Sequence, residues 1–418
     1  MSLAEAATRR TFRSLRVRNY RLFFFGQLIS VTGTWMQQVG QDWLVLRLTN
    51  RPLPLGITLA LQFAPMLVLG AWAGVVADRL DKRRMLLATQ AAMASLALVL
   101  GVLTATGAVR LWMLYVLALL LGCATAFDMP TRQAFVSEMV GPDRVANAIG
   151  LNSAVFNSAR VVGPAVAGVL IAAVGIAPAF LINAVSYLAV IAGLLAMDPD
   201  RLHRLPSVDR AKGQVRAGLR YVWADPVLRS TIALVAVVGV LGLNYRVALP
   251  LLARFTFGGG AGAYGALASI MAAGSVVGAL AAARRGRPSR RLLLGSVVAF
   301  GLLSLVAAAA PTLTVEAIVL APLGLASITF LATANSTLQL ASSPGMRGRV
   351  MALYGLVFLG STPLGGLLGG WMAGQFGPRS ILLLSGVSSL AAALVALLPR
   401  RRPAADAALA VEDAHDAA

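Results

Sequence analysis

Apolar residues occur along the chain in long runs that short polar turns separate. A helix of about 20 apolar residues crosses the roughly 30 Å of hydrocarbon in a bilayer. Twelve runs come close to or exceed that length, at residues 22–46, 55–77, 85–106, 111–129, 145–174, 177–197, 229–252, 262–283, 292–310, 315–340, 350–376 and 381–398. None of the runs alternates apolar and polar residues as membrane β-strands do. The pattern therefore predicts an all-α membrane protein with twelve transmembrane helices.

The runs fall into two sets of six that share one feature. The second run of each set carries a Gly-x-x-x-Gly pair just before an arginine-rich turn, Gly70 with Gly74 and Gly274 with Gly278. In some transporters two parallel repeats enclose a substrate site near the bilayer midplane. We therefore expect two pseudo-symmetric six-helix bundles, related by a two-fold axis along the membrane normal.

One sizeable polar segment joins the two sets of runs, and another follows the last run. Residues 198–228 carry apolar side chains at helical spacing, which predicts an amphipathic helix that either lies on the inner leaflet or connects the bundles in solvent. The tail is rich in alanine and acidic residues, and we expect it to be disordered. The predicted parts are an N-terminal bundle, a cytoplasmic linker, a C-terminal bundle and a cytoplasmic tail, at residues 1–197, 198–228, 229–399 and 400–418.

Charge adds an orientation to this picture. Only 12% of the residues are charged, yet the net charge is +20. Most lysines and arginines lie before the first run and in the turns on the same side of the expected membrane, which marks that side as cytoplasmic. We expect a bacterial-type inner or plasma membrane protein with both termini in the cytoplasm. The positive charge is then a topology signal, and no nucleic-acid partner is expected.

The residues that usually carry enzymatic or metal chemistry are scarce. The chain has one cysteine, Cys123, and two histidines, His203 and His415, which lie outside the apolar runs. A disulfide within the chain or a cysteine-based metal cluster is thereby excluded. The sequence also contains no G-x-x-x-x-G-K-[ST] nucleotide-binding loop. We expect no enzyme, no cofactor and no metal, and ATP-driven transport would require another subunit.

The turn after the second run contains a recognisable motif. Its sequence, from Gly74 through Asp78 and Arg79 to Arg83, resembles the signature loop of the major facilitator superfamily, G-x-x-x-D-R-x-G-R-R, with Asp81 at the usual glycine position. The resemblance implies a latch that holds the cytoplasmic side closed when the protein opens outward. A plainer interpretation, basic residues that anchor a short turn, accounts for the arginines but not for the acid beside them.

Two further segments resemble one branch of that superfamily. Residues 127–135 and 159–164 are similar to those of the transmembrane secretion effectors, which include the enterobactin exporter and macrolide efflux proteins, and the likeness covers nearly the whole chain. Gly163, Pro164 and Gly168 resemble the superfamily's antiporter motif, in which a proline bends the fifth helix. The resemblance also suggests that Asp128 pairs with the signature-loop arginines and belongs to the latch.

One feature of the superfamily's proton antiporters is missing. They often carry an arginine four residues before a glycine in the fourth helix. If that glycine is Gly122, the arginine's position is occupied by Ala118. The usual arrangement for proton coupling is therefore absent, although export itself is still compatible with the sequence.

Polar residues inside the runs indicate where a substrate or proton site lies. Charged groups at membrane depth are costly and need a partner or water. By depth along their helices we expect Asp42 to pair with Arg160, and Arg246 and Glu316 either to pair or to line an extracellular gate. The candidate residues for substrate binding and proton coupling are Thr34, Gln38, Asp42, Asn157, Arg160, Arg246 and Glu316.

The preferred function is a secondary active exporter of hydrophobic or amphipathic small molecules, such as a drug, a siderophore or a secondary metabolite. We expect proton-coupled antiport by alternating access, with the small molecule, protons and membrane lipids as partners and a monomer as the active unit. The interior has few hydrogen-bonding residues outside the first and fifth runs, which disfavours sugar uptake. An uptake carrier for a polar nutrient is the alternative, and a membrane scaffold or receptor without transport activity comes third.

Overall fold

The computed structural model describes residues 12–203, 214–285 and 288–397. Every regular element in these ranges is a helix. The elements are η1 (Arg13–Arg16), α2 (Arg18–Thr49), α3 (Leu53–Arg79), α4 (Lys82–Ala105), α5 (Leu111–Val140), η2 (Pro142–Arg144), α6 (Val145–Val174), α7 (Ala177–Leu195), η3 (Pro199–Arg201), α8 (Gln214–Ala224), α9 (Pro226–Val237), η4 (Val238–Gly242), α10 (Tyr245–Leu251), η5 (Leu252–Thr256), α11 (Ala261–Arg285), α12 (Arg290–Ala308), α13 (Leu313–Ala341), α14 (Pro344–Phe376) and α15 (Arg379–Leu397).

The predicted membrane spans correspond to these helices. Within the described ranges, eleven segments are long and apolar enough to cross a membrane, and α9, η4, α10 and η5 together form one of them, Pro226–Thr256. The remaining predicted span is α2, whose glutamines, arginines and Asp42 lower its mean hydropathy. At 32 residues α2 exceeds the length that a bilayer requires. The all-α prediction is confirmed.

Glycines hold α2 against its neighbour α7. Gly26, Gly33 and Gly40 recur every seven residues and share one helix face. A Cβ placed on them would lie 3.0 Å from Val190 Cα, 2.5 Å from an Asn183 side-chain atom and 3.2 Å from the Phe180 ring, respectively. Because close helix packing in membranes depends on small residues, this face fixes α2 in the first half although the helix is more polar than the other spans.

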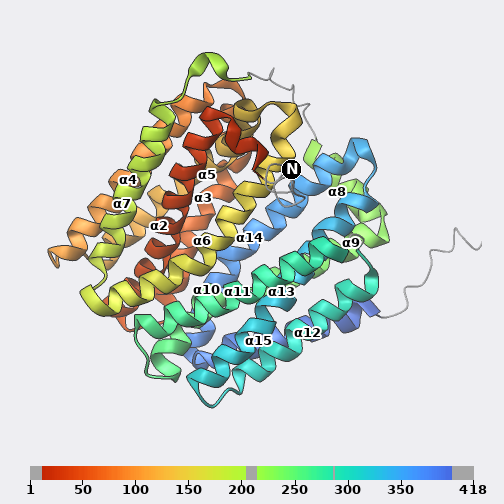
Figure 1. Ribbon diagram of the computed structural model, residues 1–418. Coiled ribbons are helices and arrows are strands. Elements are labelled where there is room, and N and C mark those ends of the chain that lie inside the picture. The colour runs from red at the N-terminus through yellow and green to blue at the C-terminus, as the bar shows by residue number, and fades with distance from the viewer. Residues whose placement is uncertain (1–11, 204–213, 286–287, 398–418) are drawn as a thin grey trace, which may run out of the picture.

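The two halves of the chain form two groups of helices. Figure 1 shows α2 to α7, coloured red to yellow-green, gathered on one side and α9 to α15, coloured green to blue, on the other. In the first half α2 packs on α6 and α7, α3 on α5, and α4 on α7; in the second half α11 packs on α13, and α12 on α13 and α15. Between the halves the extensive contacts are those of α3 with α14 and of α6 with α11.

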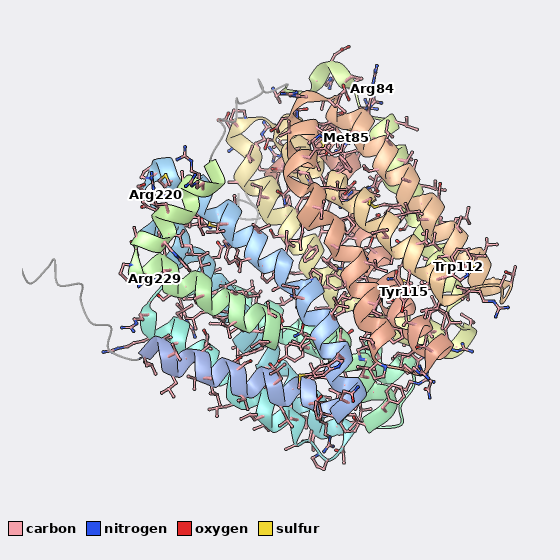
Figure 2. All side chains as sticks on the ribbon, turned by 180° about the vertical axis from the view of Figure 1, so that it is seen from behind. Arg84, Met85, Trp112, Tyr115, Arg220 and Arg229 are labelled. Carbon is pink, nitrogen blue, oxygen red and sulfur yellow. The ribbon has the colours of Figure 1, made fainter. Side chains whose placement is uncertain are left out.

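The molecule has a basic end and a far end. Figure 2 shows Arg84 at one end of the first-half helices and Trp112 near the other, and it shows Arg220 and Arg229 at one end of the second half. We call the end with these three arginines the basic end and the opposite end the far end. Under the orientation that the charge pattern predicts, the basic end faces the cytoplasm.

The two halves touch toward the far end and separate toward the basic end. A Cβ on Gly56 of α3 would lie 2.3 Å from the Gly366 carbonyl oxygen of α14, and one on Gly265 of α11 would lie 2.4 Å from the Pro164 carbonyl oxygen of α6. We call these two contacts the seam. Nearer the basic end, Gly150 of α6 has no such neighbour within 4 Å. We call the region between the halves on the basic side of the seam the central opening, and in the predicted orientation it faces the cytoplasm.

The two Gly-x-x-x-Gly pairs differ in their packing. A Cβ on Gly274 would lie 1.9 Å from the Ala321 carbonyl oxygen, and one on Gly278 would lie 2.7 Å from the Leu325 carbonyl oxygen, so α11 lies directly on α13. At Gly70 of α3 no neighbouring atom is within 4 Å. The helix pairing itself is repeated, since α3 packs on α5 as α11 packs on α13. The close approach at Gly274 has no counterpart at Gly70.

We expect Gly274→Ala to destabilise the folded protein and Gly70→Ala to leave its stability unchanged. The new methyl group at position 274 would overlap the Ala321 carbonyl oxygen, and the strain of overpacking typically costs about 1–3 kcal/mol. The apparent melting temperature of the purified protein in detergent measures this difference. Equal melting temperatures of the two variants would contradict the packing described for α11 and α13.

The linker prediction is only partly within the described residues. Residues 204–213 and 398–418, which include part of the predicted linker and the whole predicted tail, lie outside them. The remainder of the linker contains the helix α8, which packs on the start of α14. Val222 is buried, and the Ser343 backbone N–H donates to the Tyr221 hydroxyl at 3.1 Å. This helix is therefore anchored to the second half at the basic end.

Candidate functional site

A buried carboxylate joins the two halves next to the seam. Asp42 of α2 is 2% exposed. Its Oδ2 accepts a hydrogen bond from the Tyr264 hydroxyl of α11 at 2.8 Å and from Arg246 Nε of α10 at 3.4 Å. Arg246 also donates to Gln62 Oε1 of α3 at 3.1 Å. We call Asp42, Gln62, Arg246 and Tyr264 the gate cluster, because two of its residues come from each half.

The position of Arg246 depends on a broken helix. The span that carries it passes through η4, a π-helical turn, and is interrupted at Leu243 and Asn244 before α10 begins. The Asn244 side chain donates to the Val240 carbonyl oxygen at 2.7 Å, which satisfies part of the freed backbone. Such irregular turns often mark functional sites in helices. Here the interruption starts a new helix one residue before Arg246.

The gate cluster is shielded from water. The Arg246 side chain is 20% exposed, and its guanidinium lies 5.7 Å from the centre of the Phe63 ring. Tyr264 is buried as fully as Asp42. Removing one partner of a buried ion pair leaves an uncompensated charge, which is strongly unfavourable. The contact between the halves is therefore sensitive to the charge of Asp42.

The α6 residues that resemble the superfamily's antiporter motif, Gly163, Pro164 and Gly168, lie at the second contact of the seam. A Cβ on Gly168 would lie 3.2 Å from the Cα atoms of Gly262 and Gly265 in α11, and one on Gly163 would lie 2.4 Å from Trp35 Cβ in α2. Pro164 lies between them, and α6 continues through it. This segment of α6 therefore contacts its own half on one face and the second half on another.

The comparisons with known proteins decide the family. The family model described as transmembrane secretion effector matches residues 9–417. The chain belongs to this family. It is 28% identical to the multidrug efflux pump Tap of Mycolicibacterium fortuitum over 91% of this chain and 96% of that protein. It is 23% identical to the macrolide efflux protein A of Streptococcus pyogenes, again over 91% of this chain and 96% of the relative.

A third relative is matched over a shorter length. The staphyloferrin A transporter of Staphylococcus aureus is 27% identical over 62% of this chain, and the match spans 66% of that protein. Among solved structures, the nucleoside transporter NupG has a TM-score of 0.71 at 13% identity, covering 92% of this chain and 98% of that chain. A bacterial homologue of the lysosomal transporter Spinster, inward-facing and unoccupied, has a TM-score of 0.70 at 16% identity, covering 91% and 95%. These structures share the fold.

The ion pair predicted between Asp42 and Arg160 is not formed, and neither is the Arg246–Glu316 pair, which was one of two alternatives for those residues. Asp42 pairs with Arg246 instead of Arg160, because its carboxylate points toward the second half, whereas depth along a helix says nothing about direction around it. Arg246 is therefore not paired with Glu316. Glu316 lies in the first turn of α13, is fully buried, and neither carboxylate oxygen has a hydrogen-bond partner among the described residues.

The predicted polar stripe of α2 divides between several neighbours. The Thr34 hydroxyl donates to the Ser30 carbonyl oxygen at 2.9 Å and lies 3.4 Å from the Tyr187 hydroxyl of α7. Gln38 is half-buried. Asn157 of α6 is half-buried as well, and its amide donates to the Ser153 carbonyl oxygen at 2.8 Å. These residues remain candidates for contact with a substrate.

Asp128 forms a cluster of its own within the first half. It pairs with Arg132 one turn further along α5, and it accepts hydrogen bonds from Thr89 at 2.9 Å and Gln90 at 2.7 Å. The resemblance suggested a signature-loop arginine as partner, but Arg83 donates to the Leu194 and Leu195 carbonyl oxygens of α7 instead. Arg132 displaces it because residues four apart on one helix already lie side by side.

In the signature loop, Asp81 replaces the usual glycine, and its side chain has a structural role there. The Asp81 side chain accepts a hydrogen bond from the Arg84 backbone N–H at 2.9 Å and thereby caps the start of α4. The next residue, Lys82, forms an ion pair of 2.8 Å with Glu138 near the end of α5. An aspartate before a run of helix-forming residues is a pattern from which this cap could be predicted. The sequence contains no such pattern for the ion pair between Lys82 and Glu138.

The remaining latch residues lie around the end of α3. Gly74 is buried, Asp78 is half-buried and Arg79 is exposed. In an outward-open state we expect the latch to bring Asp78 to the start of α14, near residues 345–349, and this contact stays a prediction. Among the described residues no three His, Cys, Asp or Glu side chains are grouped as a metal site.

Proposed function

We propose that this protein is a proton-coupled secondary exporter of hydrophobic or amphipathic small molecules that works by alternating access. Two relatives matched over nearly their whole length are a multidrug efflux pump and a macrolide efflux protein. Apolar side chains support a substrate with apolar parts, since Ile149 and Phe156 on α6 and Leu356 on α14 are each about half exposed. Hydrophobic and aromatic residues with a few polar groups are typical of small-molecule sites.

The gate cluster carries this proposal. Asp42 of the first half holds Arg246 and Tyr264 of the second half where the two halves touch. Opening the seam would expose Asp42 to the outer medium, where it can take up a proton. Closing the seam would return Arg246 to Asp42, which favours the charged carboxylate and releases the proton inward. Each outward movement of substrate is then matched to one inward proton, as alternating access requires.

The orientation is part of the proposal. We place the basic end in the cytoplasm because lysine and arginine mark cytoplasmic loops. The central opening then admits substrate from the cytoplasm or the inner leaflet, and the gate cluster lies on the outer side of the site.

Transport by everted membrane vesicles from an efflux-deficient bacterial host tests the function. The probes are an amphipathic anion, 1-pyrenebutyrate, a cation, ethidium, and the macrolide erythromycin. We expect at least one of them to accumulate in energised everted vesicles and to leak out when a proton uncoupler is added. Accumulation in right-side-out vesicles instead would identify an uptake carrier, and accumulation that resists the uncoupler would contradict proton coupling.

We expect Asp78→Asn to slow export while the amount of protein in the membrane stays unchanged. The latch assigns Asp78 a charge interaction with the start of α14 in the outward-open state, and an interaction of a charge with a helix terminus changes a population by about 2-fold to 5-fold. Asp81→Asn is the matched control, because asparagine caps α4 as well as aspartate does. Normal export by Asp78→Asn would remove the latch.

A further inference from the structure

Arg160 is a cation at membrane depth that has no partner among the described residues. It lies 15 residues after the start of α6, at Val145, which places it about 22 Å along the helix from the basic end. It is half-buried, and no hydrogen bond or ion pair joins it to any residue in the described ranges. A charged side chain at this depth needs a partner or water. Arg132 of α5 and Arg246 of α10, by contrast, each form an ion pair with an aspartate.

The carboxylates that could pair with Arg160 are committed elsewhere or enclosed. Asp42 is held by Arg246 and Tyr264. Asp128 is held by Arg132 and its neighbours. Glu316 is fully buried, and its carboxylate oxygens lack any hydrogen-bond partner in the part of the chain that the structure describes. The described part of the chain therefore supplies no counter-charge for Arg160, and a bound molecule is the alternative source.

The direction of Arg160 is given by its neighbours on α6. Ile149, Ser153, Phe156 and Arg160 follow each other at spacings of four, three and four residues, so they form one stripe along the helix. Ile149 is 55% and Phe156 is 51% exposed. One turn beyond Arg160 the same side of the helix is covered, because Pro164 meets Gly265 of α11. The exposed stripe thus ends at Arg160, one turn before the contact of α6 with α11, on the side of the seam that we call the central opening.

The surroundings of Arg160 combine a cation with aromatic surface. The ring of Phe156, one turn nearer the basic end, lies 5.6 Å from the ring of Trp35 on α2 in an edge-to-face arrangement. A guanidinium offers a planar set of donors that matches a carboxylate or phosphate with two hydrogen bonds. An apolar body stacked on the aromatic pair would place such a group within reach of Arg160.

We propose that Arg160 binds the oxyanion of the transported molecule, and that the substrates are amphipathic anions whose apolar body lies along Phe156 and Trp35. This inference rests on the proposed export function and adds the charge of its substrate. In the absence of substrate, water in the central opening solvates the guanidinium. When the anion binds, the site at Arg160 becomes neutral.

Binding of a matched pair of probes tests the proposal directly. 1-Pyrenebutyrate and its methyl ester have the same apolar body and differ in charge. Their binding to the purified full-length protein in a neutral maltoside detergent is followed by energy transfer from tryptophan to pyrene. The variants are Arg160→Gln, Arg160→Lys and, as a matched control, Arg51→Gln, which removes an exposed arginine from the loop between α2 and α3.

We expect wild type and Arg51→Gln to bind the carboxylate about ten-fold more tightly than the ester, which corresponds to about 1.4 kcal/mol. Arg160→Gln is expected to bind both probes with the affinity that wild type has for the ester, and Arg160→Lys to restore part of the preference. Equal affinity of wild type for the two probes, no saturable binding of the carboxylate, or a preference that survives Arg160→Gln would overturn the proposal.

A second arm separates a substrate anion from an anionic lipid headgroup. The titrations are repeated in nanodiscs that contain phosphatidylglycerol. An unchanged preference supports a substrate site, whereas loss of the preference there would show that a headgroup occupies Arg160 and would overturn the proposal. Transport is measured separately in everted vesicles. Binding that depends on Arg160 without uncoupler-sensitive accumulation would count against the export function alone.

Discussion

Asp42→Asn is expected to abolish proton-driven accumulation while substrate exchange across the membrane continues. Asparagine keeps an oxygen that can accept from Tyr264, but it carries no charge to hold Arg246 and no site for the proton. Removing one partner of a buried ion pair costs about 3–5 kcal/mol. We therefore expect uncoupler-sensitive export to fall at least about ten-fold, a change that about 1.4 kcal/mol would already produce.

The measurement compares two modes of transport by the same vesicles. Uphill accumulation of the probe that wild type exports best reports proton coupling, whereas counterflow at equal proton concentration on both sides needs only alternating access. Asp42→Asn should lose the first and keep the second. Asp143→Asn, which neutralises an exposed acid in η2, is the control and should keep both. Full uphill accumulation by Asp42→Asn would place the coupling elsewhere.

A double-mutant cycle distinguishes the pair from two independent residues. Arg246→Gln alone leaves Asp42 as a buried charge without its ionic partner, so its loss should be as large as that of Asp42→Asn. Combining the two removes both charges, and the double variant should transport no worse than either single variant. Losses that simply add would show that Asp42 and Arg246 act separately.

The sequence predicts the fold of this protein better than its contacts. The long apolar runs can only be helices in a bilayer, and the structure confirms them, including α2 with its many polar residues. Depth along the helices, by contrast, predicted Arg160 as the partner of Asp42, whereas the structure pairs Asp42 with Arg246. The expected depths of Arg160 and Asp42 differ by a gap that a long arginine side chain can partly close, but the Asp42 carboxylate points across the seam to α10. The packing of one half on the other leaves no local pattern in the sequence.

Two further differences between the structure and the superfamily's pattern follow from interactions between residues close together in the sequence. Asp128 prefers Arg132, which is four residues away on the same helix, over an arginine from the signature loop. Asp81 departs from the superfamily's glycine because it caps α4. Each of these two interactions joins residues three or four positions apart, so each could be predicted from the sequence. The partner of Lys82, Glu138 of α5, and the contact of Gly265 with Pro164 needed the structure, since each joins elements far apart in the chain.

The seam itself provides the last prediction, because the proposed transport cycle closes it in only one of two conformations. A side chain on Gly265 would meet the Pro164 carbonyl oxygen at 2.4 Å and the Gly168 Cα at 2.9 Å, both backbone atoms that cannot rotate away. Gly265→Val therefore penalises the closed seam and spares the state in which α6 and α11 are apart. Overpacking costs about 1–3 kcal/mol, which shifts the population of the two states by about 5-fold to about 150-fold.

The shift is measured as a distance between two spin labels at the far end, one on Arg51 beside α3 and one on Phe376 of α14, in a background without Cys123. Gly265→Val should move the distribution to longer distances, as expected when the far end opens, and should slow export because the protein seldom returns to the inward-open state. Gly295→Val is the control, since Gly295 of α12 has no atom within 4 Å of its added Cβ and lies away from the seam. An unchanged distribution in Gly265→Val would mean that the contact between α6 and α11 does not hold the far end closed.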